Sequence, residues 1–186
     1  MPENTAQKAT LRRELLANRQ AITPEVRNAM NAAIARHLLA WQNAHPAGIL
    51  GVYWPIKGEP DLRECYAVLA EQGTRLALPI VVDRDAPLRF LSWKPGDAMI
   101  RDSYGVAIPA SGEEVQPDAL LIPCVGFNEQ LYRLGYGGGF YDRTLAQVGR
   151  PVTVGIAYEC ARARFDADAH DVPLDYLITE KESGTP

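Results

Sequence analysis

A short apolar run, GILGVY at residues 48–53, contains no charged residue and is bounded by turn-forming residues. A run of this length and composition is typical of a strand that is buried in a sheet. Downstream, Asp61 is suited to cap a helix that extends to about Gln72 before Gly73 ends it. The chain is therefore expected to pass from a buried strand into a helix, as in α/β proteins.

The rest of the chain repeats this alternation. Thr23-Pro24-Glu25 marks a helix start, because Thr suits an N-cap, Pro the first helical position and Glu the positive end of the dipole. Strands alternating with helices favour a mostly parallel sheet covered on both faces. Further strands are predicted at 75–79, 88–93, 119–122, 151–158 and 176–179, and further helices at 8–21, 24–42 and 140–148.

Two segments fall outside this pattern. Residues 94–117 are loop-rich, with Pro95, Gly96, Gly105 and Pro109, and are long enough to wrap over a binding site. Residues 182–186 are expected to be disordered. Since the chain contains no internal repeat and no low-complexity linker, we predict one domain over residues 1–186.

Composition narrows the class of protein. The 186 residues carry 19 Lys and Arg against 23 Asp and Glu, a net charge of −4, which argues against a protein that coats nucleic acid. The absence of an apolar run of about 20 residues and of a leader-like N-terminus predicts a cytoplasmic protein with no membrane partner. The cysteines are odd in number and far apart, so free thiols are expected in place of a disulfide framework or a structural zinc site: Cys65, Cys124 and Cys160.

The segment RLGYGGGFYDR at 133–143 is the most informative for chemistry. It has four glycines between residues 135 and 139, ahead of a predicted helix. Glycines let backbone N–H groups approach a ligand closely, so the segment predicts a phosphate cradle. It is neither a dinucleotide fingerprint, which needs glycine where Phe140 stands, nor a P-loop. Arg133 and Arg143 suit phosphate oxygens, and Asp142 suits Mg²⁺. A mobile glycine turn with solvated charges is the alternative.

A second cationic group is predicted on the first helix. Lys8, Arg12 and Arg19 fall within about 40° of one another around the helix axis, beside an apolar stripe that includes Leu15. Such a pattern usually marks a solvated basic face. The glycine segment favours a different interpretation, because an acidic protein that binds a polyphosphate needs a local source of cations.

Carboxylates and aromatic residues complete the candidate site. The turn after residues 48–53 contains Tyr53 and Trp54, which can stack on a flat heterocycle, and Glu59, which can accept hydrogen bonds from its N–H groups. Taken alone, this stretch also fits an edge turn. In HDVPLD at 170–175, Asp171 is a candidate second Mg²⁺ ligand, whereas His170 is more readily explained as structural.

Taken together, these segments resemble the 5-formyltetrahydrofolate cyclo-ligase family. The likeness rests on Lys8-x-x-x-Arg12, Glu59, PDALLIP at 117–123, the glycine segment at 133–143 and HDVPLD at 170–175. The resemblance implies a three-layer α/β/α, Rossmann-like fold. It also implies conversion of 5-formyltetrahydrofolate to 5,10-methenyltetrahydrofolate by a monomer that uses Mg·ATP and releases ADP and phosphate.

The resemblance also implies roles for individual residues. The catalytic residues would be Glu59, Arg133 and Asp142. Asp142 and Asp171 would hold Mg²⁺. Glu59 would anchor a folate N–H or accept a proton. Folate would contact Trp54, Glu59, Tyr136, Gly137, Gly138, Gly139 and Phe140. ATP would contact Lys8, Arg12, Arg133, Leu134, Gly135, Tyr136, Gly137, Gly138, Gly139, Phe140 and Tyr141.

The sequence departs from the family pattern just before the glycine segment. Asn128 stands where the family commonly has aspartate, and Leu131-Tyr132 where it has glycine, which leaves the turn before Arg133 open. Two other functions are kept as alternatives. One is a binding module for nucleotide, folate or RNA on the same fold, and the other is an enzyme like the sugar-phosphate isomerases or CoA transferases.

Overall fold

The computed structural model describes residues 2–147, 149–168, 170–181 and 183–184. Its centre is an eight-stranded sheet with the order β12-β11-β10-β7-β1-β2-β3-β6. The run from β11 to β2 is parallel, and the strands added at either end are antiparallel. The predicted mostly parallel sheet is therefore confirmed. The strands are β1 (Ile49–Gly51), β2 (Arg75–Ile80), β3 (Arg89–Trp93), β6 (Glu114–Val115), β7 (Ala119–Pro123), β10 (Val152–Ile156), β11 (Tyr176–Ile178) and β12 (Ser183–Gly184).

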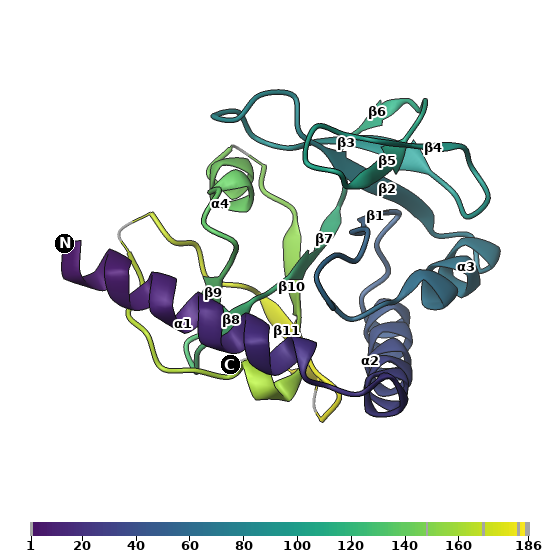
Figure 1. Ribbon diagram of the computed structural model, residues 1–186. Coiled ribbons are helices and arrows are strands. Elements are labelled where there is room, and N and C mark those ends of the chain that lie inside the picture. Colours follow the sequence, from purple (N-terminus) through teal and green to yellow (C-terminus); the bar gives the residue numbers. More distant parts are fainter. Residues whose placement is uncertain (1, 148, 169, 182, 185–186) are drawn as a thin grey trace.

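Helices cover both faces of this sheet (Figure 1). None of those in the described ranges combines the length and apolar character needed to cross a bilayer. In Figure 1, α2 and α3 lie on one side of the sheet and α4 on the other, the predicted α/β arrangement. The helices are α1 (Pro2–Gln20), α2 (Pro24–Ala44), α3 (Arg63–Glu71) and α4 (Phe140–Leu145), with a 3₁₀ turn, η1 (Glu159–Ala161).

Strand β7 explains why the core has two halves. Its side chains alternate: Ala119 and Leu121 pack in the cluster that α2 and α3 cover, and Leu120 and Ile122 pack in the cluster that contains Leu145 of α4. Because successive residues of a strand point to opposite faces, an all-apolar run is what a strand buried on both faces requires.

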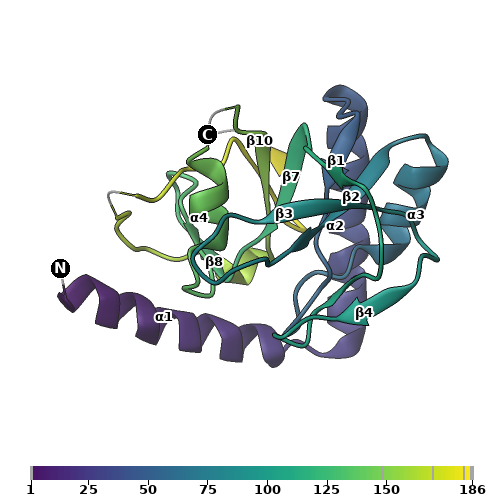
Figure 2. The same ribbon diagram turned by 90° about the horizontal axis from the view of Figure 1, so that it is seen from above.

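Helix α1 lies apart from these two layers. Figures 1 and 2 show it as a long helix whose N-terminal end extends past the rest of the molecule. Leu15 packs with Val125 and Leu134 in a third apolar cluster, beside the hairpin of β8 (Gly126–Phe127) and β9 (Arg133–Leu134). The apolar stripe of this helix therefore faces the segment that leads into the glycine run.

Predicted helix ends agree with the structure in part. Helix α2 begins at Pro24, and the Thr23 hydroxyl accepts from the amide of Val26, as an N-cap should. Helix α3 begins at Arg63 with Leu62 at the cap, and Asp61 caps it from one residue earlier by accepting the Arg63 amide at 3.2 Å. Helix α4 ends at Leu145, three residues earlier than predicted, and the predicted last residue, 148, lies outside the described residues.

Several short antiparallel strands were not predicted. The loop-rich segment 94–117 contains β6 and a second hairpin formed by β4 (Met99–Arg101) and β5 (Ala107–Pro109). Strands of two or three residues carry too few side chains to show an alternating pattern. Expected disorder at 182–186 is wrong for Ser183–Gly184, which form β12, while residues 182, 185 and 186 lie outside the described part of the chain.

Candidate active site

One cavity of about 500 Å³ lies beyond the carboxyl ends of β1, β2 and β7. Ligands bind at this edge in open α/β sheets, and the volume is that of a small-molecule site. All the residues that the family resemblance assigns to catalysis, ATP, folate or Mg²⁺ lie on the wall of this cavity: Lys8, Arg12, Trp54, Glu59, Arg133, Leu134, Gly135, Tyr136, Gly137, Gly138, Gly139, Phe140, Tyr141, Asp142 and Asp171.

Apart from Tyr53, the other residues that line the cavity were not predicted individually. The β4–β5 hairpin contributes Asp102, Tyr104 and Val106, so the loop-rich segment does reach the cavity, and Tyr104 packs edge-on against Phe140 at 6.1 Å. The only signal in the sequence for these three residues was an aromatic side chain, Tyr104, within the loop-rich segment. The floor and the remaining wall are formed by Tyr53, Ile56, Lys57, Pro79, Val81, Leu88, Ile122, Pro123 and Asp168.

The glycine loop, residues 135–139, joins β9 to α4. Gly137 and Gly139 have φ of +95° and +68°, a left-handed conformation that favours glycine. Arg12 Nε donates to the carbonyl of Gly135 at 2.8 Å, and Arg143 Nη2 donates to that of Gly138 at 2.9 Å. Within the described residues, the amides of Gly137 to Gly139 donate to no acceptor. Arginines therefore hold the loop by its carbonyls and leave its amides available.

Arg143 differs from its predicted role. It does not line the cavity. Besides Gly138, its guanidinium donates to the carbonyls of Arg84 at 2.7 Å and Ala86 at 3.3 Å. It fixes the glycine loop against the β2–β3 connection and does not face the cavity in which it was predicted to contact phosphate.

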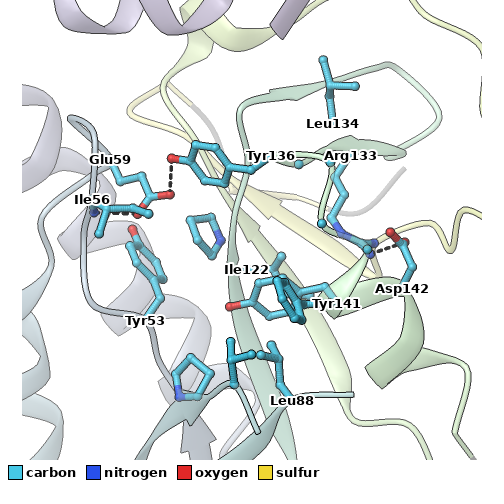
Figure 3. A pocket seen from close by; sticks show the side chains of 18 of the residues that line it. Tyr53, Ile56, Glu59, Leu88, Ile122, Arg133, Leu134, Tyr136, Tyr141 and Asp142 are labelled. Atoms are coloured by element: carbon cyan, nitrogen blue, oxygen red, sulfur yellow. Dashed lines mark hydrogen bonds and ion pairs between the residues drawn. The ribbon is translucent and has the colours of Figure 1, made fainter. Parts of the chain in front are cut away.

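Arg133 connects the glycine loop to two other segments. Its buried guanidinium forms an ion pair with Asp142 of α4 and donates to the carbonyl of Val172 at 2.9 Å. Figure 3 shows the Arg133 side chain directed at Asp142. A planar guanidinium can serve both acceptors at once, which a lysine ammonium could not do with the same geometry.

Lys8 is held by two carboxylates. Its ammonium lies 2.7 Å from Asp168 and 3.1 Å from Asp171. Burial lowers the pKa of Lys8, but the hydrogen bonds to both carboxylates outweigh this effect and raise the pKa, so the side chain stays charged. Sequence reasoning missed Asp168, for which only the acid-rich composition of 166–171 was a signal. Asp171 is therefore a partner of Lys8 in this structure.

The two predicted Mg²⁺ ligands, Asp142 and Asp171, line the same cavity, each paired with a cation. Across the described ranges, no three or more His, Cys, Asp or Glu side chains form a metal-binding group. Mg²⁺ commonly binds through one or two carboxylates together with substrate phosphates and water. The donor set therefore fits a Mg²⁺ ion that arrives with a polyphosphate.

Glu59 occupies the opposite wall of the cavity. Its side chain is 3% exposed, and its two oxygens accept from the Ile56 amide at 2.8 Å and the Tyr136 hydroxyl at 2.7 Å. Figure 3 shows the Tyr136 hydroxyl pointing at the Glu59 carboxylate, with a hydrogen bond between them. Burial raises the pKa of Glu59 above its ordinary 4.5, partly offset by these hydrogen bonds and by the charge of Arg19.

The two aromatic residues beside Glu59, Tyr53 and Trp54, differ in burial and in their contacts. Tyr53 is almost fully buried and donates its hydroxyl to the carbonyl of Pro60 at 2.7 Å. Trp54 is half-buried, packs edge-on against Trp93 at 6.1 Å and lies 5.1 Å from the Arg63 guanidinium. Trp54 therefore offers more ring surface to a heterocycle than Tyr53 does.

The turn that departs from the family pattern keeps a defined geometry. The Asn128 side-chain oxygen accepts from the amides of Gln130 and Tyr132, and its amide donates to the Phe165 carbonyl. Leu131 has φ of +59°, a left-handed conformation at the position where the family has glycine. The uncharged Asn128 is thus sufficient to hold this turn, and Leu131 accepts a backbone conformation that a glycine would adopt without strain.

Comparison with known proteins gives consistent results. A family model described as the 5-formyltetrahydrofolate cyclo-ligase family matches residues 4–180. A 5-formyltetrahydrofolate cyclo-ligase of Mycoplasma pneumoniae is 31% identical over 177 residues, covering 94% of this chain and 99% of the relative. The enzyme of the same name from Escherichia coli K12 is 31% identical over 170 residues, covering 87% and 93%.

Solved structures agree with these sequence matches. The NMR structure of Aquifex aeolicus 5,10-methenyltetrahydrofolate synthetase has a TM-score of 0.84 and 30% identity, covering 96% of this chain and 92% of that one. A 5,10-methenyltetrahydrofolate synthetase from Mycoplasma pneumoniae has a TM-score of 0.79 and 28% identity, covering 93% and 98%. The similarity covers nearly the whole of each chain.

Proposed function

The chain belongs to the 5-formyltetrahydrofolate cyclo-ligase family, and from that premise we propose how its cavity works. The reaction is the ATP-dependent conversion of 5-formyltetrahydrofolate to 5,10-methenyltetrahydrofolate, with release of ADP and phosphate. The observation that carries the assignment of roles is that a glycine loop with available amides and a buried carboxylate form opposite walls of one cavity. Two ligands, one anionic and one rich in N–H groups, can meet there.

The glycine-loop wall binds the polyphosphate of ATP. The amides of the loop donate to phosphate oxygens, and Lys8, Arg12 and Arg133 supply positive charge from α1 and β9. Phosphoryl transfer needs little covalent chemistry from a protein, because alignment and charge stabilisation carry most of the effect. The structure of this wall fits that requirement.

Asp142, with Asp171 at the other side of the loop, would hold Mg²⁺ against the phosphates. When bound there, Mg²⁺ would offset the charge that builds on the transferring phosphoryl group. The Arg133 side chain, already paired with Asp142, stays close to the same phosphoryl oxygens.

The Glu59 wall binds the folate. Each Glu59 oxygen already accepts one hydrogen bond and retains a second lone pair, which an N–H of the folate heterocycle can occupy. Trp54 and Phe140 line the same space and give the ring system apolar surface. This arrangement directs the formyl group toward the glycine loop.

The order of bond changes follows from the chemistry of the formyl group. Its oxygen is a poor leaving group, so it first attacks the terminal phosphorus of ATP, and ADP leaves. N10 of the folate then attacks the activated carbon, loses its proton, and phosphate leaves as the five-membered ring closes. No covalent protein nucleophile is needed, so the roles of this chain's residues are binding, alignment and charge stabilisation.

The test is a spectroscopic assay for the methenyl product with purified protein, 5-formyltetrahydrofolate and Mg²⁺, with ATP present or omitted. Product that depends on ATP supports the proposal. Binding of both ligands without product identifies a binding module instead, and product without ATP excludes the proposed activation of the formyl oxygen.

A second measurement addresses ATP alone. Ligand at about 100 times its dissociation constant stabilises a folded protein by about 2.7 kcal/mol, so Mg·ATP should raise the midpoint of thermal unfolding by several degrees. An unchanged midpoint at millimolar Mg·ATP contradicts an ATP site in the glycine loop.

In this proposal residues 1–186 act as one domain, as a monomer, in the cytoplasm.

A further inference from the structure

Arg19 is a buried cation that the proposed mechanism does not use. It lies in the last turn of α1, is 4% exposed, and does not line the cavity. Its guanidinium donates to the Tyr136 hydroxyl at 2.6 Å, to the Lys57 carbonyl at 3.1 Å and to the Cys124 carbonyl at 3.4 Å. A single side chain thus contacts the glycine loop, the turn that carries Glu59 and the end of β7.

These contacts fix the direction of a hydrogen-bond chain. A guanidinium can only donate, so the Tyr136 oxygen accepts from Arg19. The single hydroxyl proton of Tyr136 is then directed to its other partner, the carboxylate oxygen of Glu59 at 2.7 Å. Arg19 therefore determines that the Tyr136 hydroxyl donates to Glu59. Arg19 itself does not line the cavity, because Tyr136 lies between it and Glu59.

We propose that Arg19 is a positioning residue for folate binding, which acts by holding Tyr136 so that its hydroxyl donates to Glu59. The proposal rests on the function proposed above, in which Glu59 anchors the folate. Because Tyr136 belongs to the glycine loop, the same contact ties the loop to the folate wall. Without Arg19 the hydroxyl of Tyr136 is free to rotate, so its hydrogen bond to Glu59 is no longer held in one direction.

The charge of Arg19 has a second effect on Glu59. Burial raises the pKa of this carboxyl, and the positive charges of Arg19 and Lys57 oppose that rise. Removing Arg19 therefore raises the pKa further, and a higher pH is needed to ionise Glu59. The titratable and charged groups that face Glu59 are Arg19 of α1, Lys57 of its own turn, Tyr53 after β1, Tyr66 of α3, Cys124 after β7, Tyr136 of the glycine loop and Tyr141 of α4.

The experiment compares steady-state kinetics of the wild type, Arg19→Met and Arg19→Lys, with folate and ATP varied separately. For Arg19→Met we expect the KM for 5-formyltetrahydrofolate to rise at least tenfold, while the KM for ATP changes by less than threefold. The acid limb of kcat/KM for folate should move to higher pH. Arg19→Lys keeps the charge, so its acid limb should stay at the wild-type position while KM recovers only in part.

Tyr136→Phe and the double variant test whether Arg19 acts through the tyrosine. If it does, then at a pH well above the acid limb, where Glu59 is ionised in every variant, the double variant raises the folate KM no more than the larger of the two single changes. Multiplied effects overturn the proposal, as does an equal rise in both KM values. Arg27→Met is the matched control. Among the described residues, Arg27 donates to the carbonyls of Arg19 and Ile22 and to no atom of Tyr136 or Glu59, so the change should leave both KM values unchanged.

Two further results keep the outcome unambiguous. Should Arg19→Met fail to fold, Arg19→Lys with Tyr136→Phe still gives the pH profile and the coupling. Equilibrium binding of 5-formyltetrahydrofolate, measured by calorimetry on the same variants, separates the two proposals. A wild type that binds folate without turnover contradicts the proposed function, and the ratio of the dissociation constants of Arg19→Met and wild type still decides the role of Arg19.

Discussion

The glycine-loop wall and the Glu59 wall of the cavity both hold buried charge, but they balance it in different ways. At the glycine loop, Lys8 and Arg133 each form direct ion pairs with carboxylates. Among the described residues, no cation lies within ion-pair distance of Glu59, which instead accepts from a backbone amide and a tyrosine hydroxyl. The nearby cation Arg19 is linked to Glu59 by two hydrogen bonds through the Tyr136 hydroxyl.

This difference between the walls matches the two roles proposed for them, which are binding of a polyphosphate and binding of a folate. Ion pairs at the glycine loop can exchange partners when an anion arrives, since each cation meets a new negative group and each carboxylate is released for a metal ion. In the proposed function, the hydrogen bonds around Glu59 are arranged in advance for the neutral, N–H-rich ring system of the folate. We therefore expect changes at the glycine loop to reduce turnover and changes at Glu59 to weaken folate binding.

The largest effect is expected from Gly138→Val. A Cβ at Gly138 would lie 2.9 Å from the Phe140 ring, and in the proposed function it would obstruct the approach of a phosphate. The variant should fold and lose turnover, because the side-chain ring can shift but the obstruction remains. Product formation and the thermal midpoint are measured together, and near-normal turnover in a folded variant contradicts the phosphate-binding role of the loop.

Gly73→Val serves as the control, because we expect it to lower stability and to leave turnover unchanged. Gly73 lies in the turn between α3 and β2 with φ of +93°, away from the cavity. A valine there is strained by at least about 1–2 kcal/mol, so stability should fall while turnover per folded molecule stays unchanged. The two glycine variants together separate loss of function from loss of fold.

Asp142→Asn should have the next largest effect. If Asp142 holds Mg²⁺, turnover should fall about 100-fold or more, and the residual rate should require higher Mg²⁺, because the metal contributes several kcal/mol of charge stabilisation. The rate is measured against Mg²⁺ concentration at saturating ATP and folate. A lower rate with unchanged Mg²⁺ dependence would mean that Asp142 serves only to orient Arg133.

Asp171→Asn is the matched variant at the other proposed ligand. A role in metal binding predicts the same shift in Mg²⁺ dependence as Asp142→Asn. A role limited to holding Lys8 predicts a higher KM for ATP with no such shift, because the lysine loses one of its two carboxylates. The pair of measurements therefore tells metal ligands from ion-pair partners at this wall.

Glu59→Gln should act mainly on folate. The amide keeps the shape but loses an ionised acceptor, worth about 1.5–3 kcal/mol, so the folate KM should rise about 10- to 150-fold with the ATP KM little changed. In the wild type, kcat/KM for folate should fall as the pH drops through the pKa of Glu59, which burial places above 4.5. Glu59→Gln should remove this acid limb.

Asp61→Asn provides the control for Glu59→Gln. Asp61 lies two residues along the same turn, pairs with Arg63 and does not line the cavity. Its kinetic constants should match the wild type. A change confined to Mg²⁺ dependence in Glu59→Gln would show that the carboxylates of the two walls have exchanged roles.

Sequence reasoning recovered those parts of the fold that local pattern determines. The parallel strands are continuous apolar runs such as 119–122, and the start of α2 carries its own capping residues. Hairpin β4–β5 and strands β8 and β9 were missed although their partners are close in sequence, because strands of two or three residues carry too few side chains to show an alternating pattern.

The prediction of the site was limited in a different way. The residues that the family resemblance assigns to ATP, folate and Mg²⁺ all line one cavity, but the sequence did not predict their hydrogen-bond and ion-pair partners. Lys8, Arg12 and Arg19 were predicted to form one cationic face, whereas each binds a different segment: Asp168 and Asp171, the Gly135 carbonyl, and Tyr136. These contacts span more than 100 residues of sequence, so helical periodicity contains no information about them.

The smallest expected effect concerns the turn that leads into the glycine-loop wall. Leu131 is 7% exposed and left-handed at φ of +59°. Leu131→Ala loses apolar burial, about 2–5 kcal/mol, and keeps the strained backbone. Leu131→Gly loses the same burial but removes about 1–2 kcal/mol of strain, against an added cost of about 0.4–1 kcal/mol from the freer unfolded chain.

Glycine should therefore be more stable than alanine at position 131 by about 0.5–1 kcal/mol, measured as the free energy of unfolding in urea. Leu39, half-buried inside α2, supplies the comparison, because there glycine should be less stable than alanine by about 1 kcal/mol. If both positions favour alanine, Leu131 is not left-handed in solution, and Asn128 then holds a different turn before Arg133. In that case this turn would not place the Arg133 guanidinium beside Asp142, and the ion pairing of the glycine-loop wall would rest on Lys8 with Asp168 and Asp171.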